Sequence, residues 1–252
     1  MFISLLKRAV PVPKLTDFDS YLFVGPHPDD IELGCGGTVA KLTKMGKQVT
    51  VLIATNGCVG SIDPNLTSEQ LVQIRKQEAL TSAELLGLHD VRFLPYDDGD
   101  GYDHDAMRKD LVATILDVKP QVVVCPDHTL LTEWHPDHLN VGKLTTEAVF
   151  HASWDRLTAR MGLSGSWRNV VLAYYYTSKP NGYVKVSSTR KLRQQALACH
   201  KTQFDDKQLN MFRKYLTLRD VRFGLRSGKG HAEGYRIAPP MLRHIFPEAE
   251  EY

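Results

Sequence analysis

The sequence predicts an α/β protein with a Rossmann-like, three-layer arrangement and a mostly parallel central sheet. Short apolar, β-prone runs alternate with longer segments of helical character along the first half of the chain. A polar loop or turn follows each of the first four apolar runs at once. Strands and helices that alternate in this way form parallel sheets covered on both faces, with right-handed crossovers. Such a sheet gathers the loops after its strands at one edge, where open α/β folds bind ligands.

The individual elements follow from local patterns. We expect strands at residues 21–24, 48–54, 91–94, 121–125, 170–177 and 183–186. We expect helices at residues 38–45, 67–86, 105–118, 138–154, 187–200 and 207–223. The second helix begins with a capping box, Thr67 and Gln70, and ends at Gly87, while Ser187 or Ser188 caps the fifth. Beyond residue 228, glycines and a Pro-Pro pair predict an irregular C-terminal segment.

Composition limits the class of protein. With 42% hydrophobic and 24% charged residues, the chain is ordinary for a globular protein, and we expect one domain over residues 1–252. A net charge of +2 argues against an obligate nucleic-acid binder, and the apolar runs are too short to span a membrane. The four cysteines are scattered without a Cys-x-x-Cys pair, which is typical of a reduced protein. We therefore expect a cytoplasmic location.

The small net charge hides an asymmetry. Between residues 179 and 229, thirteen Lys and Arg residues stand against three acidic ones, a net charge of +10, and the remainder carries −8. Most of this excess falls in the helical C-terminal part that begins at about residue 187. One interpretation is solvated helix faces or a subunit contact. The other is a positive patch that concentrates anionic ligands near a cleft.

A histidine and two aspartates follow the first strand, in the stretch 25–32 (GPHPDDIE). His27 and Asp30 are three residues apart, so one bend directs both toward a single cation while Asp29 stays free. The alternative is a surface turn in which the two aspartates cap the next helix. The position at a strand-to-helix turn favours the metal hypothesis.

A second histidine cluster follows the fourth strand, where Glu133 precedes the stretch 135–138 (HPDH). A lone histidine is usually structural, but two histidines three apart that flank an aspartate at a helix start are less common. A His/Asp/His set with an open position is the composition of a catalytic zinc site. Zinc lowers the pKa of bound water to roughly 7, which makes hydrolysis possible at neutral pH.

Together these motifs resemble the PIG-L/LmbE-like family of zinc-dependent N-acetylglucosaminyl deacetylases. The resemblance covers most of the chain and rests on HPDDIE followed by LGCGG, and on HPDH about a hundred residues later. It extends to four further features: Arg75-x-x-Glu78, the Asp98-Gly99 turn, the Tyr174-Tyr175-Tyr176 strand and Ala232-Glu233-Gly234-Tyr235. One departure is Pro26, where the family usually has alanine.

The resemblance implies a role for each residue of the two motifs. His27, Asp30 and His138 would hold Zn²⁺, and imidazole and carboxylate ligands also suit Fe²⁺. Asp29 would be the general base that takes a proton from the attacking water and returns it to the leaving amine. Glu133 is the next candidate for that role.

The remaining residues of the second motif would support the reaction. His135 would stabilise the oxyanion as an imidazolium. Asp137 would orient His135 or His138, or else simply favour the helix N-terminus.

Two further residues are implied as contacts to sugar hydroxyls, Arg75 and Asp98. The alternative for each is a structural role, as a surface ion pair or a turn cap. The adjacent Asp97 leaves open which of the two aspartates faces the substrate.

The predicted function is removal of acetyl from a small molecule that contains N-acetylglucosamine. The alternative is a non-catalytic sugar- or nucleotide-binding module with the same fold. Relatives assemble as trimers or hexamers, so the resemblance implies a homo-oligomer, with no nucleic-acid or membrane partner. The basic segment raises the hypothesis of an acidic aglycone, and a neutral N-acetylglucosamine saccharide is the alternative.

Overall fold

A computed structural model gives the structure of the chain and describes residues 2–251. The strands are β1 (Ser20–Gly25), β2 (Gln48–Thr55), β3 (Asp90–Tyr96), β4 (Val122–Pro126), β5 (Val171–Tyr175), β6 (Gly182–Lys185) and β7 (Ala232–Ala238). The α-helices are α1 (Phe2–Ala9), α2 (Asp30–Gly34), α3 (Gly36–Lys44), α4 (Ser68–Leu86), α5 (His104–Val118), α6 (Pro136–Ala152), α7 (Asp155–Arg160), α8 (Arg190–Leu197) and α9 (Asp206–Ser227). Short 3-10 helices are η1 (Leu15–Asp17), η2 (Pro240–Leu242) and η3 (Pro247–Glu251).

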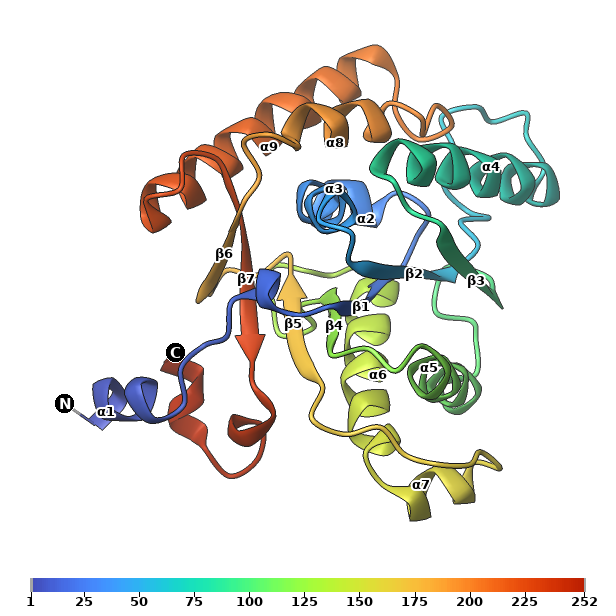
Figure 1. Cartoon of the computed structure of the whole chain (residues 1–252). Coiled ribbons are helices and arrows are strands. Elements are labelled where there is room, and N and C mark those ends of the chain that lie inside the picture. The colour runs from blue at the N-terminus through green and yellow to red at the C-terminus, as the bar shows by residue number, and fades with distance from the viewer. Residues whose placement is uncertain (1, 252) are drawn as a thin grey trace.

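A seven-stranded sheet in the order β3-β2-β1-β4-β5-β7-β6 forms the middle layer. The first five of these strands are parallel, and β7 runs antiparallel to both β5 and β6. Helices α2, α3, α4, α8 and α9 lie on one side of the sheet, and α5, α6 and α7 lie on the other (Figure 1). The predicted fold class, three layers around a mostly parallel sheet, is confirmed.

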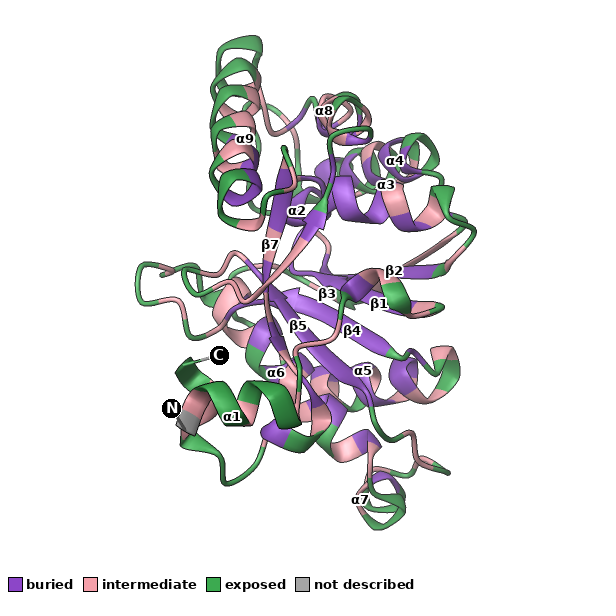
Figure 2. Cartoon of the chain, turned by 60° about the vertical axis from the view of Figure 1, so that its left-hand side comes forward, coloured by how far each residue is buried: buried purple, intermediate pink, exposed green. Residues whose placement is uncertain are grey.

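Both faces of the sheet are buried, which explains the continuous apolar runs in the sequence. Along β1, Tyr21 and Phe23 join the core on the α3 side, while Leu22 and Val24 join the core on the α6 side. Successive strand residues point to opposite faces, so each run must be apolar throughout. Figure 2 shows the buried strands between helices whose outer surfaces are exposed.

The helix ends follow the local signals in several places. The Thr67 side chain accepts a hydrogen bond from the Gln70 amide, and the Gln70 side chain accepts one from the Thr67 amide. Gly87 ends the same helix in the left-handed conformation. The predicted capping box and stop of α4 are therefore confirmed.

The C-terminal third differs from the prediction in two places. The segment expected to be irregular contains β7, whose buried Glu233 accepts hydrogen bonds from the α3 amides of Gly37 and Thr38. The helix expected to begin at Ser187 or Ser188 begins later, at Arg190, with Thr189 before it. The prediction failed at β7 because the partners of its buried carboxylate lie far away in the sequence.

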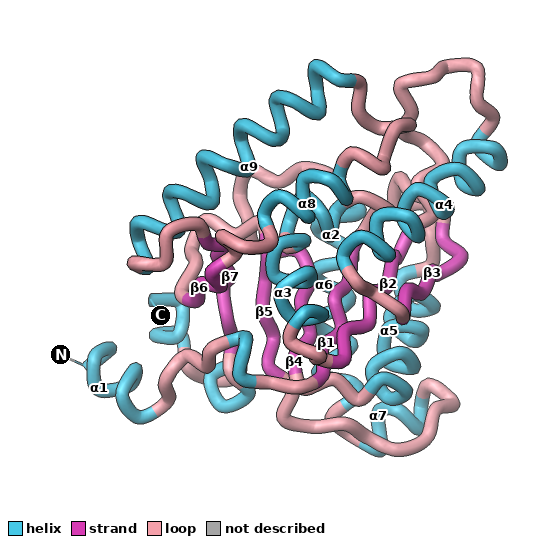
Figure 3. The backbone as a smooth tube through the Cα atoms, turned by 45° about the horizontal axis from the view of Figure 1, so that its top comes forward, coloured by secondary structure: helices cyan, strands magenta, loops and turns pink. Residues whose placement is uncertain are grey.

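Helix α9 runs along the outer side of α8 and reaches the β6–β7 end of the sheet (Figure 3). It is the longest helix among the described residues. Over residues 2–251, each helix is too short or too polar to cross a bilayer.

Candidate active site

The turn between β1 and α2 brings His27 and Asp30 together. The backbone amide of His27 donates to Asp30 Oδ2 over 2.9 Å, and the Asp30 amide donates to the His27 carbonyl over 3.3 Å. The same carboxylate oxygen lies 3.1 Å from His27 Nδ1. Both side chains are buried. These hydrogen bonds stabilise the turn, which directs an imidazole and a carboxylate toward one point at the carboxyl edge of the sheet.

The first turn of α6 adds a third donor. His135 is the N-cap and Pro136 is the first helical residue, which suits the fixed φ of proline. His138 therefore lies in the first turn, and its Nε2 is 3.3 Å from Asp30 Oδ1. The donor atoms of His27, Asp30 and His138 all lie within 4.8 Å of one another. The structure thus brings together the three residues implied as metal ligands, which we call the ligand cluster.

Each imidazole of the ligand cluster has a carboxylate at its other nitrogen. Asp137 Oδ2 lies 3.1 Å from His27 Nε2, and Glu133 Oε2 lies 2.9 Å from His138 Nδ1. Outer carboxylates of this kind fix the tautomer and the orientation of histidines that bind metals. They leave His27 Nδ1 and His138 Nε2 facing Asp30.

The partner of Asp137 differs from the expected one. The resemblance implies that it orients His135 or His138, but its carboxylate is buried and faces His27, 3.9 Å from His135 Nδ1. The reason is the turn at residues 99–100, whose amides donate to the two carboxylate oxygens over 2.9 and 3.0 Å. Although burial opposes it, these bonds and the one from His27 lower the pKa of Asp137 to about 2. Asp137 does lie in the first turn of α6, as the alternative expected.

The charges around the ligand cluster favour a cation. Burial disfavours protonation of His27, yet hydrogen bonds to Asp137 and Asp30 raise its pKa to about 10. Burial is likewise outweighed at His138, where Asp30 raises the pKa to about 9. A divalent metal bound between the rings would replace these protons. Two imidazoles and one carboxylate with room for further ligands suit catalytic zinc, and also ferrous iron.

Asp29 lies beside the ligand cluster and is held by an arginine from α4. Arg75 Nη2 lies 3.2 Å from Asp29 Oδ1, and Nη1 donates to the Gly57 carbonyl over 3.1 Å. Gly57 has a φ of +72°, and a Cβ there would meet the guanidinium at 2.5 Å, so glycine is required. Arg75 is only 3% exposed. Its partner in the structure is Asp29, and its sugar contact stays a prediction.

Asp98 and Asp97 both bind the loop that follows β2. Asp98 accepts from the amides of Cys58, over 2.5 Å, and Val59, over 3.3 Å. Asp97 accepts from the Asn56 side chain over 2.6 Å and is the more exposed of the pair. The sugar contact of Asp98 stays a prediction, as does the choice between the two aspartates.

His135 lies against the ligand cluster with about half of its side chain exposed. Its ring is stacked on that of His138 at 5.0 Å and edge-on to that of His27 at 4.7 Å. Burial and the charges of His27 and His138 lower the pKa of His135, which favours the neutral ring when no substrate is bound. Its predicted role at the oxyanion stays a prediction.

Tyr176 is a site residue that the sequence identified only as part of a family-like strand, without a role in the site. It follows β5 with a φ of +55°, an uncommon conformation for a bulky side chain. Its hydroxyl donates to Asp30 Oδ1 at 3.1 Å, and its ring is stacked on His138 at 5.7 Å. Strain of this kind is found at sites that the surrounding structure holds in place. The expected strand, residues 170–177, included Tyr176, whereas β5 ends one residue before it, so the sequence did not reveal its position at the carboxyl edge.

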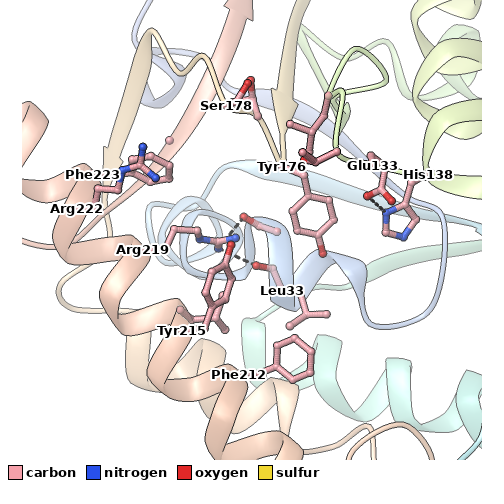
Figure 4. A pocket seen from close by; sticks show the side chains of 16 residues that line it. Leu33, Glu133, His138, Tyr176, Ser178, Phe212, Tyr215, Arg219, Arg222 and Phe223 are labelled. Atoms are coloured by element: carbon pink, nitrogen blue, oxygen red, sulfur yellow. Dashed lines mark hydrogen bonds and ion pairs between the residues drawn. The ribbon is translucent and has the colours of Figure 1, made fainter. Parts of the chain in front are cut away.

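A pocket of about 560 Å³ opens beside the ligand cluster (Figure 4). On one side it is lined by Glu133, His138 and Tyr176. The opposite wall comes from α9: Phe212, Tyr215, Leu216, Arg219, Arg222 and Phe223. The volume is within the range of small-molecule sites, roughly 300–1,000 Å³.

Residues 22–149 match the family described as PIG-L, GlcNAc-PI de-N-acetylase. The matched segment begins in β1, ends in α6 and includes both histidine motifs. This chain belongs to the PIG-L family. The resemblance predicted from the motifs is thereby confirmed.

Two known deacetylases are similar to this chain over most of its length, and a third over about half of it. The diacetylchitobiose deacetylase of Thermococcus kodakarensis is 34% identical, over 92% of this chain and 88% of the relative. The solved N,N'-diacetylchitobiose deacetylase of Pyrococcus horikoshii is 32% identical with a TM-score of 0.89, covering 98% of this chain and 94% of the other. A 1D-myo-inositol 2-acetamido-2-deoxy-alpha-D-glucopyranoside deacetylase of Kineococcus radiotolerans is 31% identical, over 53% of this chain and 45% of the relative.

Proposed function

We propose that this chain removes an acetyl group from a neutral N-acetylglucosamine disaccharide of the diacetylchitobiose kind, with a divalent metal at the ligand cluster. That it is an N-acetyl amino-sugar deacetylase follows from its family and its relatives. The disaccharide, the metal and the residue roles are the proposal. The observation that carries it is similarity over nearly the whole chain to two proteins named for this substrate, together with a complete ligand cluster.

The residue roles follow from position and charge. A zinc ion held by His27, Asp30 and His138 would supply a Lewis acid for hydrolysis of the amide. Asp29, oriented by Arg75, accepts the proton of the attacking water and passes it to the leaving nitrogen. Because the guanidinium lies on Oδ1, the other carboxylate oxygen is left for the proton.

Two aromatic residues complete the reacting centre. His135 is accessible beside the ligand cluster, where a ring nitrogen can donate to the developing oxyanion. Tyr176 holds Asp30 through its hydroxyl and covers one face of His138. We assign Tyr176 a positioning role, because its hydroxyl already binds Asp30.

A neutral saccharide is preferred over an acidic conjugate. Arg193, in the basic segment, is fully buried between Asp220 and Glu233, at 2.7 and 2.8 Å. Arg219 in the same segment donates to backbone carbonyls. These two arginines therefore support the fold, and their charge does not argue for an acidic aglycone.

Zinc as the metal, a cytoplasmic location and a homo-oligomer belong to the proposal. The four cysteines are all free, which suits a reducing compartment. Trp134 and Leu131, beside the pocket, are 89% and 100% exposed, and such apolar surface is often covered by another subunit. Light scattering of the purified protein would give the number of subunits.

Acetate release tests the function directly. The purified protein, with its metal content measured, is supplied with N,N'-diacetylchitobiose, N-acetylglucosamine and an acidic conjugate of N-acetylglucosamine. We expect stoichiometric metal and the highest kcat/KM for the disaccharide, with little dependence on salt. A preference for the acidic conjugate that weakens with salt would contradict the neutral substrate. If the protein holds no metal and releases no acetate, the result would favour a binding module.

A further inference from the structure

Helix α9 carries a row of side chains that the proposed chemistry does not use. Phe212, Tyr215, Arg219 and Arg222 are spaced by three and four residues, which places them on one face of the helix. All four line the pocket, and Figure 4 shows Arg219 reaching from α9 to α2, with Arg222 further along the helix beside Phe223. We call these four residues the α9 face.

Arg219 fixes the distance between the α9 face and the reacting centre. Its Nη2 donates to the carbonyls of Leu33 and Gly34 over 2.7 and 3.3 Å. These carbonyls end α2, and the metal ligand Asp30 begins it. At 1.5 Å per residue, the two ends of α2 lie roughly 6 Å apart along its axis. Arg219 therefore contacts the end of α2 away from Asp30, at a separation comparable with the width of one sugar ring.

Tyr215 and Arg222 are the members of this face with most free surface. The Tyr215 side chain is 55% exposed, with the Arg219 guanidinium 5.8 Å from its ring centroid. Arg222 is exposed, and its guanidinium lies 6.0 Å from the centre of the Phe223 ring, with no acidic partner within residues 2–251. Its guanidinium donors are thus available to a ligand.

An aromatic ring and a free guanidinium, about two turns apart on the same helix face, fit the chemistry of a sugar. One face of a pyranose ring presents C–H groups, which pack on an aromatic surface, and its rim presents hydroxyls, which accept from N–H donors. Tyrosine supplies a large, rigid apolar surface. Arginine supplies several donors in a fixed plane.

We propose that Tyr215 and Arg222 form the subsite for the sugar unit next to the one that loses its acetyl group. Tyr215 is the packing surface, and Arg222 donates to hydroxyls at the rim. This inference rests on the proposed deacetylase function and deepens it, because α9 then distinguishes a disaccharide from a single amino sugar.

The test compares one substrate that reaches the α9 face with one that does not. Acetate release is measured on N,N'-diacetylchitobiose and on N-acetylglucosamine, for the parent protein with its metal and for Tyr215→Ala. We expect Tyr215→Ala to lower kcat/KM for the disaccharide about tenfold, mainly through KM, equivalent to about 1.4 kcal/mol of binding. The monosaccharide value should stay within twofold of the parent.

Two further variants distinguish the loss of sugar packing on Tyr215 from general damage to α9. Tyr215→Phe keeps the ring and should retain the preference for the disaccharide. Leu218→Ala changes a residue of α9 that is 70% exposed and does not line the pocket, so it should match the parent on both substrates.

Each remaining result counts against the proposal. An equal loss on both substrates, no loss on the disaccharide, or the same loss in Leu218→Ala would overturn the subsite. If the parent acts on both sugars with equal kcat/KM, the deacetylase function stands and the subsite is refuted. If the parent releases acetate from neither sugar, the proposed function itself fails.

Discussion

The two walls of the pocket are built differently. On the sheet edge, each imidazole of the ligand cluster has a carboxylate behind it, and Asp29 has Arg75. On α9, Tyr215 is more than half exposed, and within residues 2–251 Arg222 has no acidic partner. Catalysis needs side chains held within fractions of an ångström, which supporting contacts provide. A surface that recognises the rest of a substrate, the role proposed for α9, tolerates looser placement.

The largest effect is expected at the ligand cluster itself. Asp30→Ala or His138→Ala should lose most bound metal and essentially all activity on both sugars, because three protein ligands leave little redundancy. Metal analysis and circular dichroism on the same samples check the result, and the fold should survive. His151→Ala, at the other end of α6, is the control that should keep its metal. Full metal occupancy in either ligand variant would contradict the assignment.

The next effect tests the base without touching the metal. Asp29→Asn should keep the metal but lower kcat by roughly 10²–10⁴-fold, the usual contribution of general acid–base catalysis. The decrease should be the same for the monosaccharide and the disaccharide, unlike a change in the α9 face. Steady-state kinetics with metal analysis provide the measurement. Activity near that of the parent would mean that another group, with Glu133 as the next candidate, accepts the proton.

A third change addresses what holds α9 in place. Arg193→Met leaves the buried carboxylates of Asp220 and Glu233 without their cation, which typically costs about 3–5 kcal/mol. Urea denaturation should show this decrease in the free energy of unfolding. Lys191→Met, on the exposed side of the same helix, should differ little from the parent. A decrease no larger than that of the control would mean that the ion pairs contribute little to stability.

The smallest expected effect is at the start of α4, the helix that carries Arg75. Thr67→Ala removes the capping hydrogen bond to the Gln70 amide and should lower the free energy of unfolding by about 1 kcal/mol. Thermal unfolding measures the change, and kcat should stay unchanged because Arg75 lies two turns further along the helix. Thr81→Ala, exposed in the C-terminal half of α4, is the matched control. An effect on kcat would show that the cap also positions Arg75.

The parts that the sequence predicted depend on short-range patterns. The parallel strands were recognisable because both faces are buried, and α4 because its cap and stop are adjacent in sequence. The turn holding His27 and Asp30 was also predictable, since four consecutive residues form it. The structure places the residues implied as metal ligands close together, although their metal stays a prediction.

The missed parts depend on partners that are distant in sequence. β7 contains a buried Glu233 and was expected to be irregular, because Arg193 and the α3 amides that bind the carboxylate lie far away. The same holds for the outer carboxylates, where the turn at residues 99–100 decides which histidine Asp137 faces. From the sequence, the α9 wall was predicted only as a basic helix, since no short-range sequence pattern indicates which face of a helix lines a pocket.

The sheet order has a consequence for the moment at which the protein becomes active during synthesis. β7 lies between β5 and β6, so β6 pairs with the sheet through a strand made some fifty residues later. The buried carboxylate of Glu233, which bonds to α3 and to Arg193, emerges from the ribosome at the same late stage. Pairings between distant segments form slowly, because a long loop must close first. The strands β1 to β5 and the ligand cluster thus lie in the part of the chain that is made first, whereas the α9 wall gains its β7 support only when nearly all of the chain has been translated.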